Sequence, residues 1–596
     1  MTNQSSNNRT TVGKIWGLLT PPERKSAVIL LILMFIGMGL EILGVGLVIP
    51  ALALLTQADY ATKFPAIRPL LQTLGDPSQN FLVIGSMLAL VAIYTIKAMF
   101  LTLLAWYQAR FAYGMRAEWA QRLFSVYLRQ PYTFHLQRNS AQLIHNTVNQ
   151  VDQFTIAILI PGMTLLSESL VFLGLSVMLM TVEPLGTVIV VTVLGVAGWS
   201  FHRITRGLMT RWGKASQLHE ALRFQHLAQG LGGAKDVKLL GRESEFLEQF
   251  HTHNAQSARA ARLQSTLQQL PRFWLELLAV GGLAALVLTM LAQGLALAAI
   301  LPTLGMFAAA AFRLLPSVNR ILNTIQLFKY AKPIIDNVHA ELSLPTPEAD
   351  TRMSQRPPFE HTLELHRVAY AYPNAAAQAL SNITLIIQRG ESVGFVGSSG
   401  AGKSTLVDIL LGLLTPVAGE VRVDGHDIQS SLRRWQDQIG YVPQTIFLTD
   451  DTLRRNVAFG LPNAQIDEAA VQRAIRAAQL EEFVNGLPAG LDTVVGERGV
   501  RLSGGQRQRV GIARALYHDP AVLILDEATS ALDTATERGV MEAVRALQGN
   551  KTVVVVAHRL STVQYCNRLY RLEKGQMAEQ GSYSEAPEHQ KVHKPV

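Results

Sequence analysis

Cysteine and charged residues are scarce in this sequence. Cys566 is the single cysteine among 596 residues, so an intramolecular disulfide framework is excluded. We expect Cys566 to be a core residue of a soluble domain. Charged residues make up 16% of the chain and hydrophobic residues 49%, whereas soluble proteins average about 25% charged residues. The composition therefore indicates a chain that is partly embedded in a membrane.

Long apolar runs are confined to the first part of the chain, before about residue 325. Six of them are long enough to span a bilayer as a helix, near residues 26–55, 81–107, 154–181, 185–202, 273–292 and 295–322. The start, MTNQSSNNRT, lacks the basic and then apolar layout of a cleavable signal. We therefore expect the first span to stay in the protein.

Basic residues lie mainly on one side of the predicted spans. The stretches before span one, between spans two and three, and between spans four and five carry Arg9, Lys14, Arg24, Lys25, Arg110, Arg116, Arg122, Arg129, Arg138, Arg203, Lys235, Lys238, Arg242 and Arg272. The opposite side carries Lys63 and Arg68. This positive-inside pattern predicts that both termini and both long connections are cytoplasmic. The net charge of +9 then requires no nucleic-acid partner.

The two long connections have helical patterns, as in AEWAQRLFSVYLR and SEFLEQFHTHNAQSARAARLQSTL. We expect the membrane helices to continue into the cytoplasm and to be joined there by short crossing helices. The later stretch ELSLPTPEADTRMSQRPP is polar and rich in proline, which indicates a linker. The predicted organisation is a cytoplasmic tail at 1–25, a membrane domain at 26–325, a linker at 326–358, a nucleotide-binding domain at 359–584 and a disordered tail at 585–596.

Short and nearly continuous apolar runs mark the second part of the chain. ESVGFVG and AVLILDE have the pattern of parallel strands that are covered on both faces, and helix-like segments lie between them. The predicted fold class is therefore a polytopic α-helical membrane domain with six transmembrane helices, followed by an α/β P-loop nucleotide-binding domain.

The stretch GSSGAGKST lies between the first of these strands and the helix-like LVDILLGLL, which is the context of a phosphate loop. Glycines let backbone N–H groups close around phosphate oxygens, Lys403 supplies a positive charge, and the Ser404 hydroxyl is suited to bind Mg²⁺. The predicted phosphate-binding residues are Gly397, Ser398, Ser399, Gly400, Ala401, Gly402, Lys403, Ser404 and Thr405.

Two carboxylates end the apolar run AVLILDE. Asp526 suits a Walker-B role, in which it holds Mg²⁺, and Glu527 is placed to polarise an attacking water. An Asp-Glu pair at a strand end is by itself more often solvated surface. Together with the phosphate loop, the pair predicts nucleotide hydrolysis.

The stretch RLSGGQRQ contains the ABC-transporter signature, and six spans followed by this domain resemble one half of an ABC exporter. The resemblance covers nearly the whole chain and implies ATP hydrolysis with Mg²⁺, coupled to transport. It implies that Ser503, Gly504, Gly505 and Gln506 face the ATP that the phosphate loop of a partner subunit holds. We expect a homodimer, because this chain carries both halves of such a site; a heterodimer is the alternative.

The same resemblance assigns roles to five further residues. Tyr372 matches the aromatic residue that stacks on adenine, and Gln444 matches the glutamine that senses Mg²⁺ and the γ-phosphate. Asp533 matches the D-loop aspartate, and His558 matches the histidine that holds the γ-phosphate. Glu497 matches a loop that contacts the cytoplasmic helices of the partner. The catalytic set is then Glu527, His558 and Lys403, and the metal set is Ser404, Gln444 and Asp526.

Three cations lie inside the predicted spans, where charge is costly. Arg313 and Arg320 are seven residues apart, which is close to two helical turns, so they share one helix face. Lys97 lies near the middle of the second span. We consider two interpretations: the cations bind an anionic substrate in the membrane cavity, or they snorkel or pair with buried acids. The available acids are Glu41, Glu168 and Glu276.

The stretches EILGVGLVIPALALL, GLGGAKDVKLLGRESEFLEQF and AFRLLPSVNRI resemble bacterial lipid-linked oligosaccharide flippases. That resemblance implies the bacterial inner membrane, a polyprenyl-pyrophosphate-linked glycan as substrate, and pyrophosphate binding by Arg313, Arg320 and Lys97. It also suggests that residues 59–80 form an external helix near the polyprenyl tail.

Other functions remain open at this stage. The ATPase motifs do not separate substrates, so a multidrug or lipid A exporter is an alternative. A regulatory membrane ATPase that transports nothing is a second alternative, against which the intact catalytic residues argue. A peptide exporter with a leader protease would carry an N-terminal cysteine-protease domain, and the tail has no cysteine. A DNA-repair ATPase shares the signature but has no membrane spans.

Overall fold

The computed structural model describes residues 11–56, 79–182, 184–292, 297–345, 359–373, 375–528, 534–557 and 560–581. The chain divides into two units, one made of Met1–Gln130 and His135–Pro347, the other of Pro131–Phe134 and Glu348–Val596. Long helices form the first unit, and the second contains all strands of the described residues. This confirms the predicted fold class.

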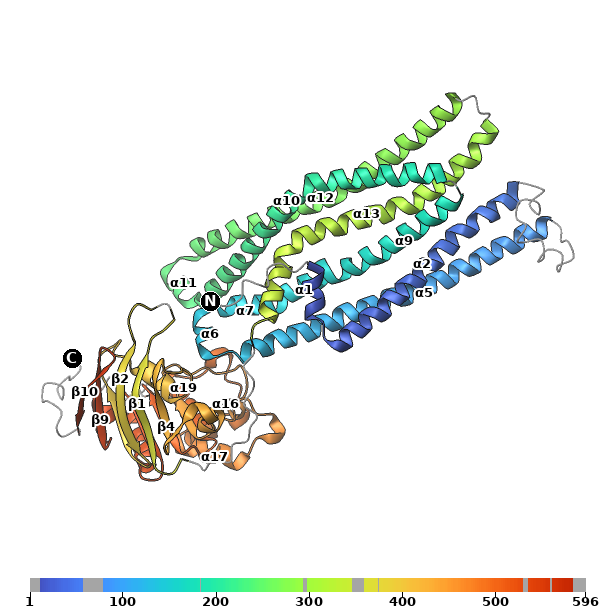
Figure 1. The fold of residues 1–596 in the computed structure, drawn as a ribbon. Coiled ribbons are helices and arrows are strands. Elements are labelled where there is room, and N and C mark those ends of the chain that lie inside the picture. The colour runs from blue at the N-terminus through green and yellow to red at the C-terminus, as the bar shows by residue number, and fades with distance from the viewer. Residues whose placement is uncertain are drawn as a thin grey trace. The chain divides into compact units, whose positions relative to one another are not determined.

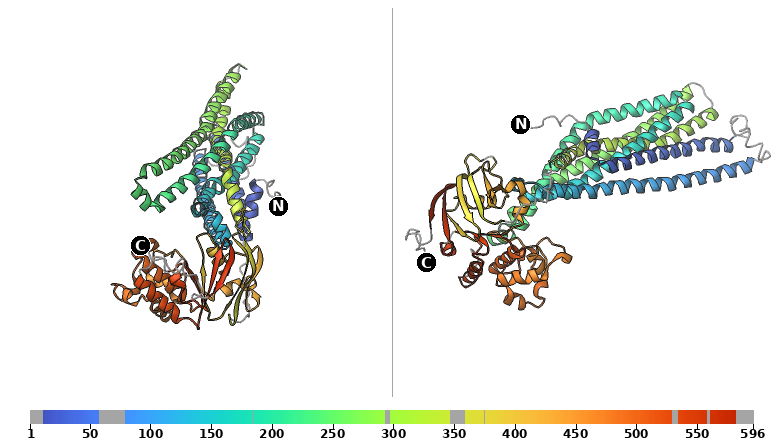
Figure 2. Two further views of the ribbon diagram at one scale, coloured as in Figure 1. Left: turned by 90° about the vertical axis from the view of Figure 1, so that its left-hand side faces the viewer. Right: turned by 60° about the horizontal axis from the view of Figure 1, so that its bottom comes forward.

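Six long helices form the first unit within the described residues (Figure 1). They are α2 (Pro21–Thr56), α5 (Gln79–Leu128), α9 (Ile160–Val182), α10 (Pro184–Gly232), α12 (Glu243–Ala292) and α13 (Leu297–Leu342). In the views of Figures 1 and 2, α2 lies alongside α5 and α10 lies alongside α12. Within the described residues, each predicted span falls on one of these helices. The one exception is the start of the third span, residues 154–159, which lies in shorter helical segments before α9.

Short helices join the long ones, as the sequence predicts. Helix α6 (Tyr132–Gln137) follows α5, and α11 (Ala234–Leu240) connects α10 to α12. The chain reaches α9 through α7 (Ser140–His145), the π-helical η3 (Asn146–Gln150), α8 (Val151–Phe154) and the π-helical η4 (Thr155–Leu159). Helix α5 has 50 residues and is therefore about 75 Å long, more than twice the roughly 30 Å of a bilayer core. Long helices thus extend well beyond any membrane they cross.

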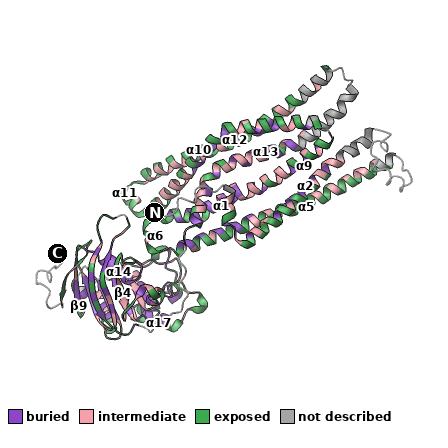
Figure 3. Ribbon diagram, viewed as in Figure 1, coloured by how far each residue is buried: buried purple, intermediate pink, exposed green. Residues whose placement is uncertain are grey.

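Three helical stretches of the described residues are long and apolar enough to cross a membrane: Pro21–Leu47, Val83–Leu128 and Ser140–Thr181. Large apolar side chains are exposed along them, such as Leu88 at 66% and Met99 at 70%. Figure 3 shows exposed residues along the long helices, whereas the central strands β3 (Ser392–Val396), β7 (Val522–Asp526) and β8 (Thr552–Val556) of the second unit are almost wholly buried. Lipid contact explains an apolar exposed surface of this kind.

Two segments that the sequence analysis placed outside the membrane domain, the cytoplasmic tail and the linker, contain helix. The predicted tail holds α1 (Thr11–Leu18), which contacts α13 through an ion pair of 2.6 Å between Lys14 Nζ and Asp336 Oδ1. The predicted linker began at residue 326, but α13 continues to Leu342. Ile334, Ile335 and Val338 are buried at helical spacing in this continuation, which explains why it stays helical. The rest of the linker, the predicted external helix apart from its last two residues, and the C-terminal tail lie outside the described residues.

The second unit contains two sheets. An antiparallel sheet has the order β2-β1-β4-β5, and a mainly parallel sheet has the order β10-β9-β3-β8-β7-β6. The strands are β1 (Thr362–Tyr370), β2 (Leu380–Gln388), β3 (Ser392–Val396), β4 (Ala418–Val423), β5 (His426–Asp427), β6 (Ile439–Val442), β7 (Val522–Asp526), β8 (Thr552–Val556), β9 (Arg568–Glu573) and β10 (Gln576–Gly581). The two runs predicted to be parallel strands are β3 and β7, and both are almost wholly buried.

Helices pack around these sheets. They are α14 (Lys403–Leu410), α15 (Leu432–Gln436), α16 (Leu453–Val457), α17 (Glu468–Ala477), α18 (Glu481–Asn485), α19 (Gly504–Leu516), α20 (Thr534–Ala546) and α21 (Leu560–Val563). Two of them, α14 and α19, begin with predicted site residues. Cys566 packs against the larger core cluster as expected. Burial raises the pKa of its thiol to about 12, so Cys566 is a weak nucleophile at neutral pH.

Helices α10 and α13 approach each other closely at Gly213. A Cβ atom on Gly213 would lie 1.9 Å from the backbone carbonyl oxygen of Tyr330. By contrast, a Cβ on Gly207 in the same helix would have nothing within 4 Å. The absence of a side chain at Gly213 therefore sets the distance between the two helices.

We predict that Gly213→Ala lowers the stability of the full chain by about 1–3 kcal/mol, because the added methyl forces the helices apart. Gly207→Ala is the matched control and should be neutral or slightly stabilising, because alanine favours helix over glycine. Thermal unfolding of the detergent-solubilised protein checks this. Equal midpoints for the two variants would contradict the close contact.

Candidate functional site

The loop between β3 and α14 has the geometry of a phosphate cradle. Gly402 precedes α14 with a φ of 102°, in the left-handed region that favours glycine. A Cβ on Gly402 would lie 2.8 Å from Leu380 Cδ2, so the position also has no room for a side chain. Gly400 has a φ of 80°, and a Cβ there would meet nothing within 4 Å. The loop is therefore tightly held at Gly402 and open at Gly400.

Lys403 is the first residue of α14 and is 5% exposed. Its ammonium donates to the carbonyl oxygens of Gly397 at 2.8 Å and Ser398 at 3.0 Å. Burial lowers the pKa of Lys403, while the negative charges of Glu527 and Asp526 act in the opposite direction. A buried ammonium held over a loop of backbone N–H groups is suited to a polyanionic ligand.

The carboxylates at the end of β7 lie near this loop, since the negative charges of both raise the pKa of Lys403. Asp526 ends the strand and is 8% exposed. Glu527 follows with a φ of 49°, a conformation that is strained for a residue with a side chain. Gln444 Nε2 donates to Glu527 Oε2 at 2.7 Å. The structure thus brings together two residues that are 83 positions apart and were assigned related roles from the sequence.

Three residues at this carboxylate pair were missed in the sequence analysis. Tyr441 hydrogen-bonds Asp526 through its hydroxyl, and its own pKa is raised by burial and by that carboxylate. Gln508 donates to the Glu527 carbonyl oxygen at 3.3 Å. Burial and the charge of Asp526 raise the pKa of Asp408 to about 6. Gln508 lies within the quoted RLSGGQRQ stretch, but no local pattern marks Tyr441 or Asp408.

Tyr372 lies beside the first turn of α14. Its hydroxyl is 3.0 Å from Thr405 Oγ1, and its ring meets Tyr370 edge-on at a centroid distance of 5.1 Å. The predicted adenine-stacking residue is thus next to the phosphate loop, where a nucleotide base would be expected.

The signature residues form the N-terminus of α19. Ser503 is its N-cap, and a capping box joins Ser503 and Gln506. Ser503 Oγ accepts a hydrogen bond from the backbone N–H of Gln506 at 3.2 Å. In return, Gln506 Oε1 accepts one from the backbone N–H of Ser503 at 2.8 Å. The Gln506 side chain is therefore occupied inside the chain. Ser503 is exposed, and Gly504 and Gly505 are partly exposed. Glu497, which precedes the signature in the chain, is also exposed. Asp533 and His558 lie outside the described residues.

The donors assigned to Mg²⁺ are all oxygen atoms: the Ser404 hydroxyl, the Gln444 amide and the Asp526 carboxylate. Hard oxygen ligands are what Mg²⁺ prefers. Ser404 is exposed at the start of α14, beside the open end of the loop at Gly400. The residues that are present therefore fit a nucleotide with its Mg²⁺ ion.

Two of the three membrane cations have carboxylate partners in the first unit. Arg320 Nη1 pairs with Glu168 Oε1, and Ser317 Oγ donates to the other oxygen of Glu168 at 2.6 Å. Lys97 Nζ lies 2.7 Å from Glu41 Oε2 and over the ring of Tyr94. Arg313 belongs to α13, but its side chain lies outside the described residues. Ion pairing was the alternative that the sequence left open for these residues.

The two paired cations, Lys97 and Arg320, differ in how much of the side chain is exposed. The Lys97 side chain is only 13% exposed, whereas that of Arg320 is 54% exposed. A guanidinium has five N–H donors, so Arg320 can bind Glu168 and still offer donors to a ligand. Lys97 has little free surface, which favours a structural role for it.

Both parts of the chain match known families. Residues 380–530 match the family described as ABC transporter, and residues 66–293 match the ABC transporter transmembrane region. A protein named ATP-dependent lipid A-core flippase from Alkalilimnicola ehrlichii is 36% identical over 490 residues, which cover 79% of each chain. A protein of the same name from Nitrosococcus oceani is 32% identical over 556 residues, 90% of each chain.

A solved structure has the same fold. It is described as a bacterial Atm1-family ABC exporter with ATP bound, and it superposes with a TM-score of 0.77 over 94% of this chain and 96% of its own. Its sequence is 24% identical, so this likeness concerns the fold.

We predict that Arg320→Ala destabilises the full chain by about 1–3 kcal/mol, because the buried carboxylate of Glu168 loses its cation. Arg272→Ala is the control, since Arg272 and Glu276 form an exposed pair one turn apart with side chains 69% and 54% exposed. Thermal unfolding of both variants in detergent is the measurement. Arg320 has no structural role if both variants unfold at the wild-type temperature.

Proposed function

The chain belongs to the ABC transporters, as an exporter-type half-transporter and ATP-driven lipid exporter, and from this premise we propose that it flips a polyprenyl-pyrophosphate-linked oligosaccharide. The direction we propose is from the cytoplasmic to the outer leaflet of a bacterial inner membrane, with both termini cytoplasmic. The chain hydrolyses ATP and is a multi-pass membrane protein. Beyond this, we propose the identity of the substrate, the membrane that contains the protein, and the residues that act in binding and hydrolysis.

The hydrogen bond between Gln444 and Glu527 is the observation that carries the catalytic assignment. It orients the carboxylate so that Glu527 accepts a proton from the water that attacks the γ-phosphate. Lys403 and the loop N–H groups bind the phosphates, and Tyr372 supports the adenine. Ser404, Gln444 and Asp526 would hold Mg²⁺, which neutralises phosphate charge. His558 and Asp533 are assigned to the same site from the family pattern.

We predict that Glu527→Gln binds ATP within about twofold of wild type yet hydrolyses it at least about 100-fold more slowly, because the amide cannot accept the proton. Glu542→Gln is the control, since Glu542 is an exposed glutamate of α20 and is expected to behave as wild type. Phosphate release from the full chain in nanodiscs measures the rate. Turnover by Glu527→Gln close to that of the control would remove Glu527 from this role.

The exposed end of α19 supports a homodimer with shared sites. Ser503 and Gly504 open this helix, where backbone N–H groups and the positive end of the helix dipole suit a phosphate. In a dimer this end would face the ATP held by the partner's phosphate loop. One chain would then complete the site of the other.

Mixed dimers test the shared site. Ser503→Asp keeps a good N-cap but places a negative charge against the phosphate, so it should abolish hydrolysis without unfolding α19. Lys403→Ala should abolish hydrolysis through the phosphate loop. A dimer of one chain of each kind should regain activity, because both defects fall in one site and the other site is intact. Inactive mixed dimers would show that each chain works alone.

Two observations support a lipid with a pyrophosphate head. The Arg320 side chain on α13 stays 54% exposed, and stretches of the sequence resemble lipid-linked oligosaccharide flippases. Lipid A export is a second candidate, favoured by the names of the relatives that are 30–36% identical. Both lipids carry phosphate on an apolar anchor.

A transport assay separates these candidates. Proteoliposomes with the full chain should move a fluorescent polyprenyl-pyrophosphate oligosaccharide when ATP is present, whereas Glu527→Gln should not. A fluorescent lipid A is tested in parallel. If lipid A moves and the polyprenyl lipid does not, the second candidate holds and the first is wrong.

A further inference from the structure

A cavity of about 510 Å³ that is open to solvent lies against α10 and α13 in the first unit. Its lining is unusual because four of six residues are cationic: Arg206, Gly207, Thr210, Arg211, Lys214 and Lys329. The volume is within the range of small-ligand sites, roughly 300–1,000 Å³. This cavity is separate from Arg313, Arg320 and Lys97, and the sequence analysis did not single it out.

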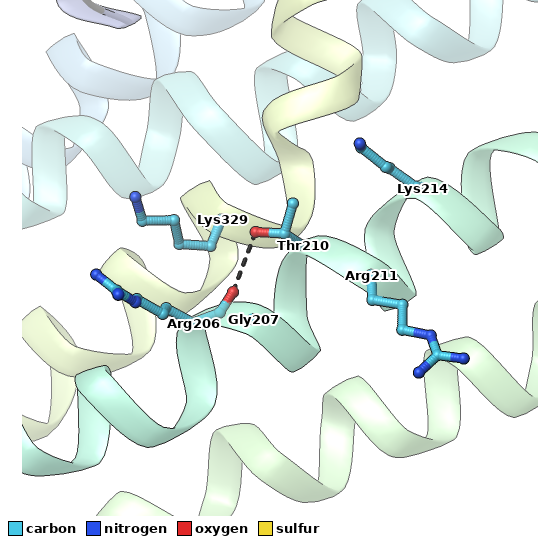
Figure 4. A pocket seen from close by; sticks show the side chains of 6 residues that line it. All are labelled: Arg206, Gly207, Thr210, Arg211, Lys214 and Lys329. Carbon is cyan, nitrogen blue, oxygen red and sulfur yellow. Dashed lines mark hydrogen bonds between the residues drawn. The ribbon is translucent and has the colours of Figure 1, made fainter.

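Helix geometry holds these cations together. Arg206, Thr210 and Lys214 are four residues apart on α10, so they share one face. Lys329 precedes Tyr330, whose carbonyl oxygen marks the close approach of α13 to Gly213. Figure 4 shows Arg206 and Lys329 extending to the same side, while Arg211 and Lys214 reach out on the other side of Thr210. The two helices thus place one pair of cations, Arg206 and Lys329, on one side of the cavity and a second pair on the other.

The cations of this cavity lack compensation within the described residues. None of the four takes part in the ion pairs found there. The acids nearest along the two helices have other partners: Asp336 pairs with Lys14 at 2.6 Å, and Glu220 accepts from Gln153 at 2.8 Å. All four cations are exposed, so solvent screens their mutual repulsion, and an anion bound here would relieve the repulsion that remains.

The position of the cavity along the helices indicates what anion it takes. Arg206 lies four residues beyond the predicted end of span four, and Lys329 lies seven beyond that of span six. At 1.5 Å per residue these distances are about 6 and 10 Å. A phosphate attached to a lipid reaches this level while its apolar chains stay in the bilayer.

We infer that this cavity is a docking site for the phosphate head of the transported lipid, occupied before the lipid is flipped. The inference rests on the proposed function only in that the cargo is a phosphate-bearing lipid, and it holds for a polyprenyl pyrophosphate or for lipid A. Arg206 binds phosphate oxygens through two N–H groups, and Lys329 acts as a point charge beside it. Arg211 and Lys214 add positive potential on the other side of Thr210.

Gly207 offers a direct test, because a side chain there meets no atom within 4 Å. Gly207→Glu places a carboxylate among the cations, and Gly207→Gln is its neutral match in shape. The probes are a radiolabelled polyprenyl pyrophosphate and a radiolabelled lipid A, bound to the full chain in phosphatidylcholine nanodiscs. For each probe that wild type binds, Gly207→Glu should weaken binding at least about tenfold, whereas Gly207→Gln stays within about twofold. Equal affinities for Glu and Gln variants would overturn the site.

A second variant removes the Arg206 and Lys329 charges themselves. Arg206→Gln combined with Lys329→Gln should weaken binding as strongly as Gly207→Glu, and higher salt should weaken wild type more than this double variant. Wild-type affinity in the double variant would overturn the inference. Thermal unfolding of the Glu, Gln and double variants verifies that each is folded, so that a loss of binding reports on the cavity.

Competition identifies the source of the phosphate. Displacement of the probe by millimolar inorganic pyrophosphate would support recognition of the phosphate group itself. Equal displacement by nanodiscs that contain phosphatidylglycerol would show a general patch for anionic headgroups, which contradicts a cargo site. The proposed substrate can be wrong while the cavity inference holds. In that case the wild-type chain moves lipid A but not the polyprenyl lipid, and Gly207→Glu still weakens the binding of lipid A.

Discussion

A bilayer accepts a backbone only when each N–H and C=O group is bonded within the segment itself, so this chain crosses it as helices. Much of the architecture depends on that constraint. Helices of 46 to 50 residues continue from the apolar stretches far beyond bilayer thickness, as in α5, α10, α12 and α13. A continuous helix keeps the rotational position of its side chains over its whole length. Residues outside the membrane are therefore placed by packing inside it.

The cations of the first unit fall into two groups because of this packing. Lys97 and Arg320 each meet a buried acid on a neighbouring helix, and Glu168 also accepts from Ser317. Arg206 and Lys329 extend to the same side of their cavity and form no ion pair within the described residues. The first group holds helices together, although the exposed Arg320 also keeps donors for a ligand, and the second group has its charge available to a ligand. Cations that look alike in the sequence thus have different roles once their neighbours are known.

Local patterns were enough to predict β3, β7, the phosphate loop and the long helices, because strand burial and helix periodicity are written in consecutive residues. Contacts between distant residues were not predictable in this way. The partners of Asp526, namely Tyr441 and the nearby Asp408, depend on how β6 and α14 pack beside β7. The choice of Glu168 for Arg320 depends on the contact of α9 with α13. The helical start of the predicted linker was hidden by its polar residues, although its buried Ile334, Ile335 and Val338 keep helical spacing.

The two π-helical segments before α9 change how this part of the chain aligns with related sequences. A π-turn contains one residue more than an α-turn, so each shifts the following helix face by roughly 100°. Two such segments, η3 and η4, lie within fourteen residues, from Asn146 to Leu159. The segment is equivalent to an α-helix that has absorbed two single-residue insertions without breaking. Alignments of homologues should therefore place short gaps here, inside a continuous helix, rather than in a loop.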